Sequence, residues 1–553
     1  VTLKESMVGD IRPTLWLLLG TVGFVLLIAV ANVANLFLVR TEEGHRERAL
    51  RAALGADAGR LARGYLSETL LIGGLAAGLG IGIAAVAVRV LRLRAPVNVP
   101  RLSEVGLDPA VVGVALAAAL LAAVLLALIP MLRRRGDLGL DLKERAGRTT
   151  AGRDRLRGRN VLVAAQVALA LILLIASGLL FRTFQELRAV DLGFSEREGL
   201  TFDIGLPGLR YGTRAHAASF HRDLLARIGS LPGVEVAAAI GQCLPLTGHM
   251  CWGEIMEAEG FPTPEGQVPP VIGARVATTE YFRALGIPVR GRTFTSADEA
   301  EGGEWVAILS EAGASAYFPG TDALGRRIRF DGEGSPWYRV VGIASDVRGR
   351  VATEEFTRTI YLPLRPDVED GPPPHTVAYV VSTSILPGGI AGGVRRAVAD
   401  LDPTIPLANV RTVEELIAAA TAPTAFALVL IGLAAAIALL LGAVGVYAVV
   451  AYAVSRRTVE IGVRMALGAG TGDVRRMVVR QGGGVVLAGV AAGLAGALLL
   501  TRLMEGMLFG VSALDPASYA LLTALMLGVA APALYLPARR ASQVNPLEAL
   551  RSE

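Results

Sequence analysis

The stretch "AFALVLIGLAAAIALLLGAVGVYAVVAYAV", residues 425–454, contains 30 consecutive residues without a charge. Roughly 20 apolar residues in a helix cross the ~30 Å hydrocarbon core of a bilayer, so this run predicts a transmembrane helix. The whole chain has a similar character: it is 53% hydrophobic and 19% charged, and its mean hydropathy is +0.51. Only 5% of its residues are aromatic, so Leu, Ala, Val and Gly supply the apolarity, as in packed membrane helices. These features predict an integral membrane protein.

Outward from this stretch, the sequence contains six further uncharged runs of 20 to 25 residues, each long enough to span a bilayer. They are residues 15–39, 69–88, 110–132, 161–181, 482–501 and 517–536. The chain is therefore predicted to be a polytopic α-helical membrane protein with seven transmembrane helices. One long segment, residues 182–424, separates the fourth span from the fifth.

The distribution of Arg and Lys orients the spans, because cytoplasmic loops carry an excess of both. The loops 40–65, 133–160 and 455–481 hold six, ten and six of these residues. On the other side, residues 1–14, 89–109 and 504–516 hold two, four and none. The first three loops are thus predicted to be cytoplasmic and residues 182–424 to lie outside. This orientation also places Val1 outside, which leads us to expect sequence upstream of it.

A repeat relates the two ends of the chain. The segment "ERALRAALGADAGRLAR" (47–63) aligns without a gap with "EIGVRMALGAGTGDVRR" (460–476). Glu47 matches Glu460, Arg51 matches Arg464, and both copies contain "ALGA". Each copy connects a long span to one that carries "AAGL". Spans one to three therefore repeat as spans five to seven, in the same membrane orientation.

Each repeated loop is predicted to form a short amphipathic helix, at residues 47–54 and 460–467. One face carries Leu50, Ala53 and Leu54 in the first copy and Val463, Ala466 and Leu467 in the second. Gly55 and Gly468 are predicted C-terminal caps, and Asp57 and Thr471 are predicted N-caps of the following helices. A basic turn held by lipid headgroups would explain one such loop. Two matching copies favour a docking surface for a cytoplasmic partner.

These loops, the three-span block and the closing "NPLEALR" (545–551) resemble the FtsX-like/MacB-like permeases of type VII ABC transporters, most closely the duplicated orphan permeases. The resemblance implies a separate cytoplasmic ABC ATPase dimer that binds ATP and Mg²⁺, with no cofactor in this chain. The docking residues would be Glu47, Arg51, Leu54, Gly55, Glu460, Arg464, Leu467 and Gly468. The chain departs from the family because spans one to three lack a preceding span and periplasmic domain.

The predicted domains are a first three-helix permease block (1–148), a basic linker with the fourth helix (149–181), an extracytoplasmic segment (182–424) and a second permease block (425–553). The extracytoplasmic segment reads as α/β or α+β. Helices are expected at 215–229 and 392–402, and a further helix is expected to be capped near Thr278. A strand is expected at 376–383, a helix N-cap at Ser310 and a hairpin around 331–334. Helix–strand units enclose strand-rich sequence near 245–365, as in a MacB-like periplasmic domain.

Catalytic motifs are absent from the sequence. It contains no Walker A "GK[ST]", and no HExxH, GxSxG or CxxC. We therefore expect neither an enzyme nor a nucleic-acid-binding protein. A metal site from His216, His221 and His249 is conceivable, but ordinary surface residues explain these histidines better. The polar residues within spans are expected to form interhelical hydrogen bonds, with a functional site as the alternative. They are Asn32, Asn35, Gln166, Tyr447 and Tyr452.

Cys243 and Cys251, the only two cysteines, both lie in the segment predicted to be outside. An oxidising compartment permits a disulfide, and an even cysteine count favours pairing. The intervening "LPLTGHM" contains Pro245 and Gly248, which allow the chain to turn. We predict a structural disulfide between the two, with two separate small apolar residues as the alternative.

Two functional hypotheses follow. The first is the permease subunit of an ATP-driven transporter in the bacterial inner membrane. Such a subunit moves its extracytoplasmic domain by mechanotransmission, for export, efflux or lipoprotein handling. Its further partner would be a periplasmic adaptor or a substrate protein. The alternative is an FtsX-like regulator of a cell-wall hydrolase or signalling partner. Both require the lipid bilayer, and the sequence selects no substrate, ATPase or oligomeric state.

Overall fold

The computed structural model describes residues 12–43, 58–94, 106–120, 151–195, 199–241, 244–247, 253–261, 269–331, 334–349, 357–367 and 375–543. The chain divides into two compact units, which we call the helical unit and the α/β unit. The helical unit comprises Val1–Glu186 and Thr424–Glu553, and the α/β unit comprises Leu187–Pro423.

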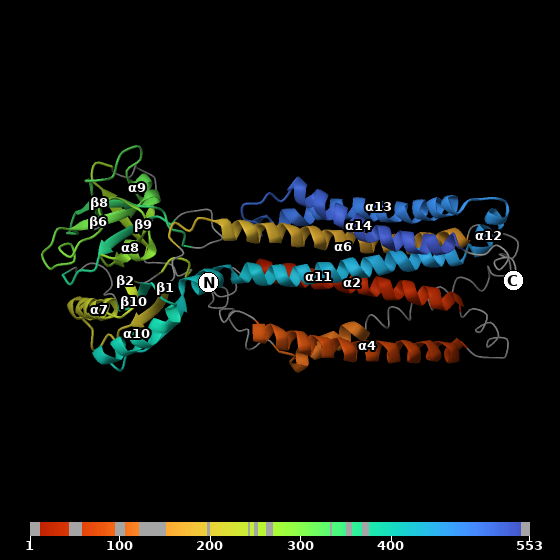
Figure 1. Cartoon of the computed structure of the whole chain (residues 1–553), viewed down its shortest axis with the longest axis horizontal. Coiled ribbons are helices and arrows are strands. Elements are labelled where there is room, and N and C mark those ends of the chain that lie inside the picture. Colours follow the sequence, from red (N-terminus) through yellow and green to blue (C-terminus); the bar gives the residue numbers. More distant parts are fainter. Residues whose placement is uncertain are drawn as a thin grey trace. The chain divides into compact units, whose positions relative to one another are not determined.

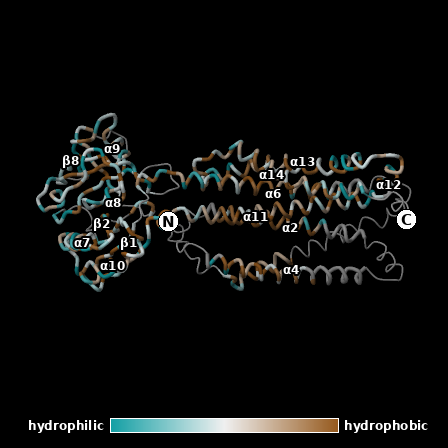
Figure 2. Tube along the Cα trace, viewed as in Figure 1, coloured by the Kyte–Doolittle hydropathy of each residue, from teal (hydrophilic) through white to brown (hydrophobic). Residues whose placement is uncertain are grey.

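Six helices of the described residues are long and apolar enough to cross a membrane, which confirms six of the seven predicted spans. Figure 2 shows apolar residues concentrated along them. The run at 110–132 is described only through a shorter apolar helix, Pro109–Leu120. The six are α2 (Arg12–Glu43), α4 (Ala58–Arg94), α6 (Ala151–Ala189), α11 (Val413–Ser455), α13 (Thr471–Leu503) and α14 (Pro516–Ala541).

Helix α6 is the most buried of the six: 56% of its apolar window is covered by the rest of the protein. Its Val167 and Leu171 belong to one apolar cluster with Ala438 of α11, Val490 of α13 and Met526 of α14. Helix α4 differs, since none of its side chains in the described part is buried. Apolar residues that face lipid need no protein cover, so an exposed apolar helix is compatible with a membrane.

Helices α13 and α6 approach each other closely at two glycines. A Cβ added to Gly489 would stand 2.7 Å from the carbonyl oxygen of Ala164, and one added to Gly493 would stand 3.0 Å from that of Ala168. Real Cβ atoms essentially never approach another atom more closely than 3.0 Å, so the packing at Gly489 requires a glycine, and Gly493 lies at this limit. The two glycines form the Gly-x-x-x-Gly pattern that brings membrane helices into contact.

The α/β unit contains a four-stranded antiparallel sheet with helices α7 and α10, arranged as two strand–helix–strand halves (Figure 1). The strand order is β11–β1–β10–β2, the ferredoxin-like arrangement. Phe202 and Tyr379 stack across the β1–β10 pair with ring centroids 4.9 Å apart. The elements are β1 (Gly199–Gly205), α7 (Arg214–Gly229), β2 (Val234–Gly241), β10 (Thr376–Thr383), α10 (Pro387–Leu401) and β11 (Leu407–Thr412).

A second lobe is inserted between β2 and β10. Six of its strands pair in the order β4–β3–β7–β8–β6–β9, and β9 pairs back with β4, so they close into a ring. Strand β4 also joins the first sheet where Ala277 pairs with Ile240 of β2. The elements are β3 (Gly253–Ala258), β4 (Val271–Ala277), α8 (Tyr281–Leu285), β5 (Val289–Gly291), β6 (Val306–Ser310), α9 (Glu311–Tyr317), β7 (Arg327–Phe330), β8 (Tyr338–Ala344) and β9 (Thr359–Pro363).

Most local predictions for this region are confirmed. Strand β10 has the predicted bounds, α7 begins one residue before the predicted helix, and β7 and β8 form the predicted hairpin. The Ser310 hydroxyl caps α9 by accepting a hydrogen bond from the Gly313 amide at 3.1 Å. Helix α10 begins at Pro387 rather than 392, because proline suits the first turn of a helix.

The predicted cap near Thr278 is wrong. Helix α8 begins at Tyr281, and its N-cap residue is Glu280, which makes no side-chain capping bond. The Thr278 hydroxyl instead accepts from the Ala239 amide at 2.9 Å and donates to the Ala239 carbonyl at 3.1 Å. Thr278 therefore ties the end of β4 to β2, a role that requires a strand distant in sequence.

Candidate functional site

The second repeated loop folds as a short helix, α12 (Thr458–Ala466), between α11 and α13. We call α12 and the turn that follows it, up to Thr471, the elbow. Glu460 and Arg464 lie one helical turn apart on its surface and form an ion pair of 2.7 Å. Both side chains are about half exposed, so the pair contributes little stability, roughly 0.3–0.5 kcal/mol for a surface i,i+4 pair. It leaves both charges accessible to a partner.

The two apolar sides of α12 have different environments. Ile461 is 1% exposed and packs into the apolar cluster of the helical unit with Val474 and Val478 of α13. Val463 is 41% exposed and Leu467 is 83% exposed. The elbow is thus anchored by Ile461, with the partly buried Met465 packed against the same cluster, while Val463 and Leu467 are presented outward.

A Schellman motif ends α12. Gly468 has φ +99°, its amide donates to the Met465 carbonyl, and the Ala469 amide donates to the Arg464 carbonyl, both at 3.0 Å. These two bonds satisfy carbonyl groups at the end of the helix, and the left-handed residue that they require is ordinarily glycine. The predicted C-cap at Gly468 is confirmed as local structure.

The N-cap prediction at Thr471 is wrong by one residue. Thr471 is the first residue of α13, and its N-cap residue is Gly470. The Asp473 carboxylate accepts a hydrogen bond from the Gly470 amide at 3.2 Å. Asp473 therefore bonds the amide of the N-cap residue itself, and its negative charge lies near the positive end of the helix dipole.

Two arginine side chains, Arg464 of the elbow and Arg457 directly before it, connect this region to α13. The Arg464 guanidinium donates to the Met477 sulfur at 2.8 Å, and that of Arg457 donates to the Gln481 side-chain oxygen at 3.1 Å. Both acceptors belong to α13, so a displacement of α12 acts directly on that helix.

The other predicted docking residues, Glu47, Arg51, Leu54 and Gly55, lie outside the described residues, as does Asp57. Cys243 and Cys251 also lie outside them. Both predictions therefore remain predictions.

The polar residues of the spans are only partly hydrogen-bonded. Asn32 donates to the Leu441 carbonyl at 2.8 Å, and Tyr447 accepts from Arg540 at 2.8 Å. Tyr452 accepts from Arg456 at 2.9 Å. In contrast, the buried carboxamides of Asn35 and Gln166 have no hydrogen-bond partner among the residues that the structure describes. Interhelical bonding explains Asn32 and Tyr447 but not these two.

Among the described residues, no three His, Cys, Asp or Glu side chains gather where they could hold a metal ion. His249 lies outside the described residues. His221 is not the surface residue that we predicted: it is fully buried, and its Nδ1 lies 2.6 Å from the Tyr379 hydroxyl. This contact joins α7 to β10 within the sheet core.

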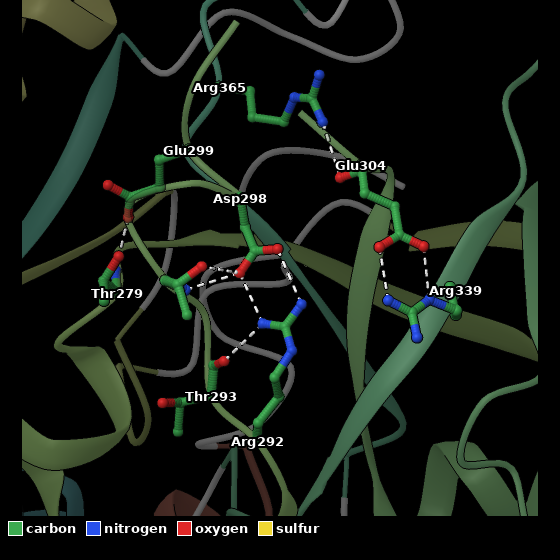
Figure 3. Close-up of polar contacts among 9 residues, drawn as sticks. Thr279, Arg292, Thr293, Asp298, Glu299, Glu304, Arg339 and Arg365 are labelled. Carbon is green, nitrogen blue, oxygen red and sulfur yellow. Dashed lines mark hydrogen bonds and ion pairs between the residues drawn. The ribbon is translucent and has the colours of Figure 1, made fainter. Parts of the chain in front are cut away.

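The inserted lobe contains a polar network that the sequence did not reveal (Figure 3). Asp298, which is 4% exposed, accepts two hydrogen bonds from Arg292, at 2.7 and 3.0 Å, and two from the Thr295 backbone and hydroxyl. Nearby, Arg365 is 1% exposed and donates to Asp367 and to the Gly303 carbonyl. These bonds fix the loop between β5 and β6, and we assign them a structural role.

Hydrogen bonds and burial shift the pKa values of carboxyl groups in and beside this loop. Burial alone would raise the pKa of Asp298, but the hydrogen bonds from Arg292 and Thr295 outweigh it and lower that pKa. Hydrogen bonds from Arg365 lower the pKa of Asp367 to about 2. Burial raises the pKa of Glu299, whose carboxylate accepts from the Thr279 amide at 2.7 Å.

Comparison with known families accounts for most of the chain. The family described as FtsX-like permease C-terminal matches twice, at residues 20–137 and 432–546. The MacB-like periplasmic core domain matches residues 161–386. The two FtsX-like matches contain the two copies of the repeat, and the periplasmic match contains most of the α/β unit.

Individual relatives agree with these matches. The chain is 28% identical over 303 residues to the macrolide export ATP-binding/permease protein MacB of Azoarcus sp. (strain BH72), which covers 51% of this chain and 42% of MacB. It is 38% identical over 131 residues to the pyoverdine export ATP-binding/permease protein PvdT of Pseudomonas aeruginosa, which covers 22% and 19% of the two chains. It is 26% identical over 271 residues to the uncharacterized ABC transporter permease YknZ of Bacillus subtilis (strain 168), which covers 48% and 65%.

The chain therefore spans less than two thirds of each of these relatives. The two FtsX-like matches, the periplasmic match and the apolar helices agree with one another. The chain is a multi-pass inner-membrane protein with an extracytoplasmic segment, and it belongs to the FtsX/MacB-type ABC permeases.

Proposed function

We propose that this permease couples ATP hydrolysis by a separate cytoplasmic ABC ATPase to movement of its extracytoplasmic α/β unit. The observation that carries the proposal is the asymmetry of α12. Ile461 anchors the helix in the apolar cluster, while Val463 and Leu467 are exposed beside the Glu460–Arg464 pair. An exposed apolar pair with charged neighbours is the composition of a protein-docking surface.

The proposed path of force begins at this surface. Gly468 and the turn that follows connect α12 directly to α13, and α13 packs against the backbone of α6 at Gly489 and Gly493. Helix α6 precedes β1 in the chain, and α11 begins at Val413, directly after β11. Movement of α12 would therefore act on the two helices that flank the α/β unit in sequence.

Export is the proposed direction of transport, because two of the relatives are named as macrolide and pyoverdine exporters. We propose the same domain division as above: a permease block at 1–148, a linker and helix at 149–181, an extracytoplasmic segment at 182–424 and a second permease block at 425–553. By the repeat, Glu47, Arg51, Leu54 and Gly55 would form a second docking elbow.

Co-purification tests the proposal. Leu467→Asp places a charge on the exposed apolar surface and should reduce recovery of the ATPase at least tenfold from membranes that contain both proteins. Leu503→Asp is the matched control, because Leu503 is equally exposed, at 83%, and lies at the opposite end of α13. Equal recovery of the ATPase with Leu467→Asp and the wild type would contradict docking at α12.

A further inference from the structure

A groove lies between helices α13 and α14, which pack side by side (Figure 1). Its volume is about 620 Å³, within the range of roughly 300–1,000 Å³ that is usual for sites of small ligands. Its lining is apolar except for one tyrosine hydroxyl. The lining residues include Val479 of α13 and, on α14, Gly528, Ala531, Pro532, Tyr535 and Leu536.

The groove exists because this side of α14 carries small side chains. A Cβ added to Gly528 would meet no atom within 4 Å, and Ala531 and Pro532 are short and exposed. Tyr535 and Leu536 border the groove, and they are 46% and 50% exposed. From Gly528 to Leu536 the helix is about 12 Å long. An elongated apolar groove on a membrane-spanning helix fits an acyl chain.

At its cytoplasmic end the groove leads to two cations. The Arg475 guanidinium donates to the Tyr535 hydroxyl at 3.5 Å and to the Thr471 carbonyl at 3.3 Å, so it lies beside the groove. Arg539 follows Tyr535 by four residues, which places it on the same face of α14, and it is exposed. Tyrosine and arginine at the cytoplasmic end of a span are typical of the interface between hydrocarbon and water.

These two cations lack a protein counterion among the described residues. The ion pairs of the helical unit in this part of the chain involve Arg182, Arg457 and Arg464, and neither Arg475 nor Arg539. Unpaired arginines at a cytoplasmic membrane surface attract anionic lipid headgroups, and a guanidinium binds phosphate through two parallel hydrogen bonds. A phosphate joined to an acyl chain therefore matches both parts of the groove.

We propose that this groove binds one anionic phospholipid of the cytoplasmic leaflet. The acyl chain lies along α14 from Gly528 to Leu536, and the phosphate accepts hydrogen bonds from Arg475 and Arg539. The Tyr535 hydroxyl lies between the two parts of the lipid. This assignment is independent of the proposed function, because it requires neither an ATPase nor a transported substrate.

Native mass spectrometry of the purified full chain tests the headgroup contacts. Dioleoyl phosphatidylglycerol and dioleoyl phosphatidylcholine have the same acyl chains, and the first bound lipid should prefer phosphatidylglycerol. Replacement of both arginines, Arg475→Gln with Arg539→Gln, should lower the phosphatidylglycerol affinity about thirtyfold, since each arginine near an anionic surface contributes a factor of about five.

The matched control for charge is Arg480→Gln with Arg540→Gln. It removes the same charge from the same two helices, but neither residue lines the groove, and Arg540 donates to Tyr447 of α11 instead. The control should keep the wild-type preference. An equal loss of affinity in the two double variants would overturn the proposal, because net charge alone would then explain lipid binding.

Gly528→Leu tests the acyl-chain contact separately. Its side chain fills the groove without displacing a neighbour, so phosphatidylglycerol affinity should fall at least tenfold. Gly484→Leu is the control, because a Cβ there also meets no atom within 4 Å and Gly484 does not line the groove. Thermal unfolding in detergent verifies that both variants fold.

Unchanged phosphatidylglycerol affinity in Gly528→Leu would overturn the proposal, since a phosphate site on the arginines alone does not need the groove. The same spectra report the mass of any protein complex. Loss of a complex in Gly528→Leu with unchanged lipid affinity would assign the groove to a protein helix instead of a phospholipid.

Discussion

Gly493 of α13 lies against the backbone of Ala168 in α6, where an added Cβ would stand 3.0 Å from the Ala168 carbonyl oxygen and 3.1 Å from its Cα. Gly493→Leu should therefore separate the two helices and destabilise the helical unit by about 1–3 kcal/mol, the usual cost of overpacking. Thermal unfolding in detergent measures this effect. Gly484→Leu is the control, because a Cβ at Gly484 on the same helix would meet no atom within 4 Å. Equal unfolding temperatures for the two variants would show that the close approach is unimportant.

Reversal of both charges of the elbow, with Glu460→Arg and Arg464→Glu, should uncouple ATP hydrolysis from transport and leave membrane insertion intact. The double variant keeps an i,i+4 ion pair and the net charge, so α12 should still form, while the charge presented to a partner is inverted. ATPase and transport rates in proteoliposomes measure the coupling. The charge-neutral control reverses the exposed pair Glu280 and Arg283 of the α/β unit. Normal coupling in the elbow variant would refute electrostatic docking there.

Cysteine labelling tests the orientation. Leu467→Cys in the elbow should resist a membrane-impermeant maleimide in intact cells, and Leu209→Cys in the α/β unit should react. Both positions are highly exposed, at 83% and 106%, so accessibility within the protein does not limit either reaction. Cys243 and Cys251 are replaced by Ser, and permeabilised cells provide the positive control. Labelling of Leu467→Cys in intact cells would invert the topology.

Protonation of Asp367, which breaks its pair with Arg365, should make the α/β unit less stable in acid. The pKa of Asp367 is lowered to about 2 in the folded protein, from about 3.9 in an unfolded chain. Its contribution is therefore complete above about pH 4 and is lost as the pH falls toward 2. Asp367→Asn should flatten this part of the pH profile. Fluorescence can follow unfolding, because the Arg365 guanidinium lies 4.3 Å from the Trp305 ring centroid. An unchanged acid profile would exclude a stabilising pair.

The disulfide between Cys243 and Cys251 can be tested by thiol titration of the unreduced, denatured protein. Closure of so short a loop should stabilise the fold by about 2–3 kcal/mol on the chain-entropy estimate. No free thiol per chain is the expected result, and two would refute the bridge. Neither cysteine is part of a CxxC motif, so we expect a structural bridge.

The sequence predicted the membrane helices well, because a bilayer accepts only long apolar runs and such runs are visible without structural knowledge. It also predicted Gly468, because a left-handed helix end requires a glycine locally. Thr471 was misassigned because α13 begins one residue earlier than expected, with Gly470 as its N-cap residue, and the side chain that bonds this end of the helix is Asp473. His221 was predicted to be exposed because its partner, Tyr379, is 158 residues away.

The burial of Arg365 could not be inferred for the same reason. Asp298 is bonded by its sequence neighbours Arg292 and Thr295, but Arg365 lies beyond β9 and donates to the Gly303 carbonyl, which is distant in sequence. Charged residues in a turn ordinarily face water, and no pattern in "GRTFTSADEAEGG" (291–303) indicates which of them is buried. Which of these charged residues is buried is decided by the contacts of the folded lobe.

Asn32 of α2 lies against Gly445 of α11, where an added Cβ would stand 2.8 Å from Asn32 Oδ1. This contact has a consequence for how a sequence can encode such a bundle. Asn32 lies 15 residues before Glu47, and Gly445 lies 15 residues before Glu460, so the two are counterparts in the duplicated blocks. An assembly of two identical subunits would place the same residue on both sides of this contact, either two asparagines or two glycines. Two asparagines would compete for the same space, and two glycines would supply no polar group. When both blocks belong to one chain, one copy can provide the Asn32 amide and the other the glycine that leaves space for it. The duplication therefore allows a contact between two different residues that two identical subunits could not form.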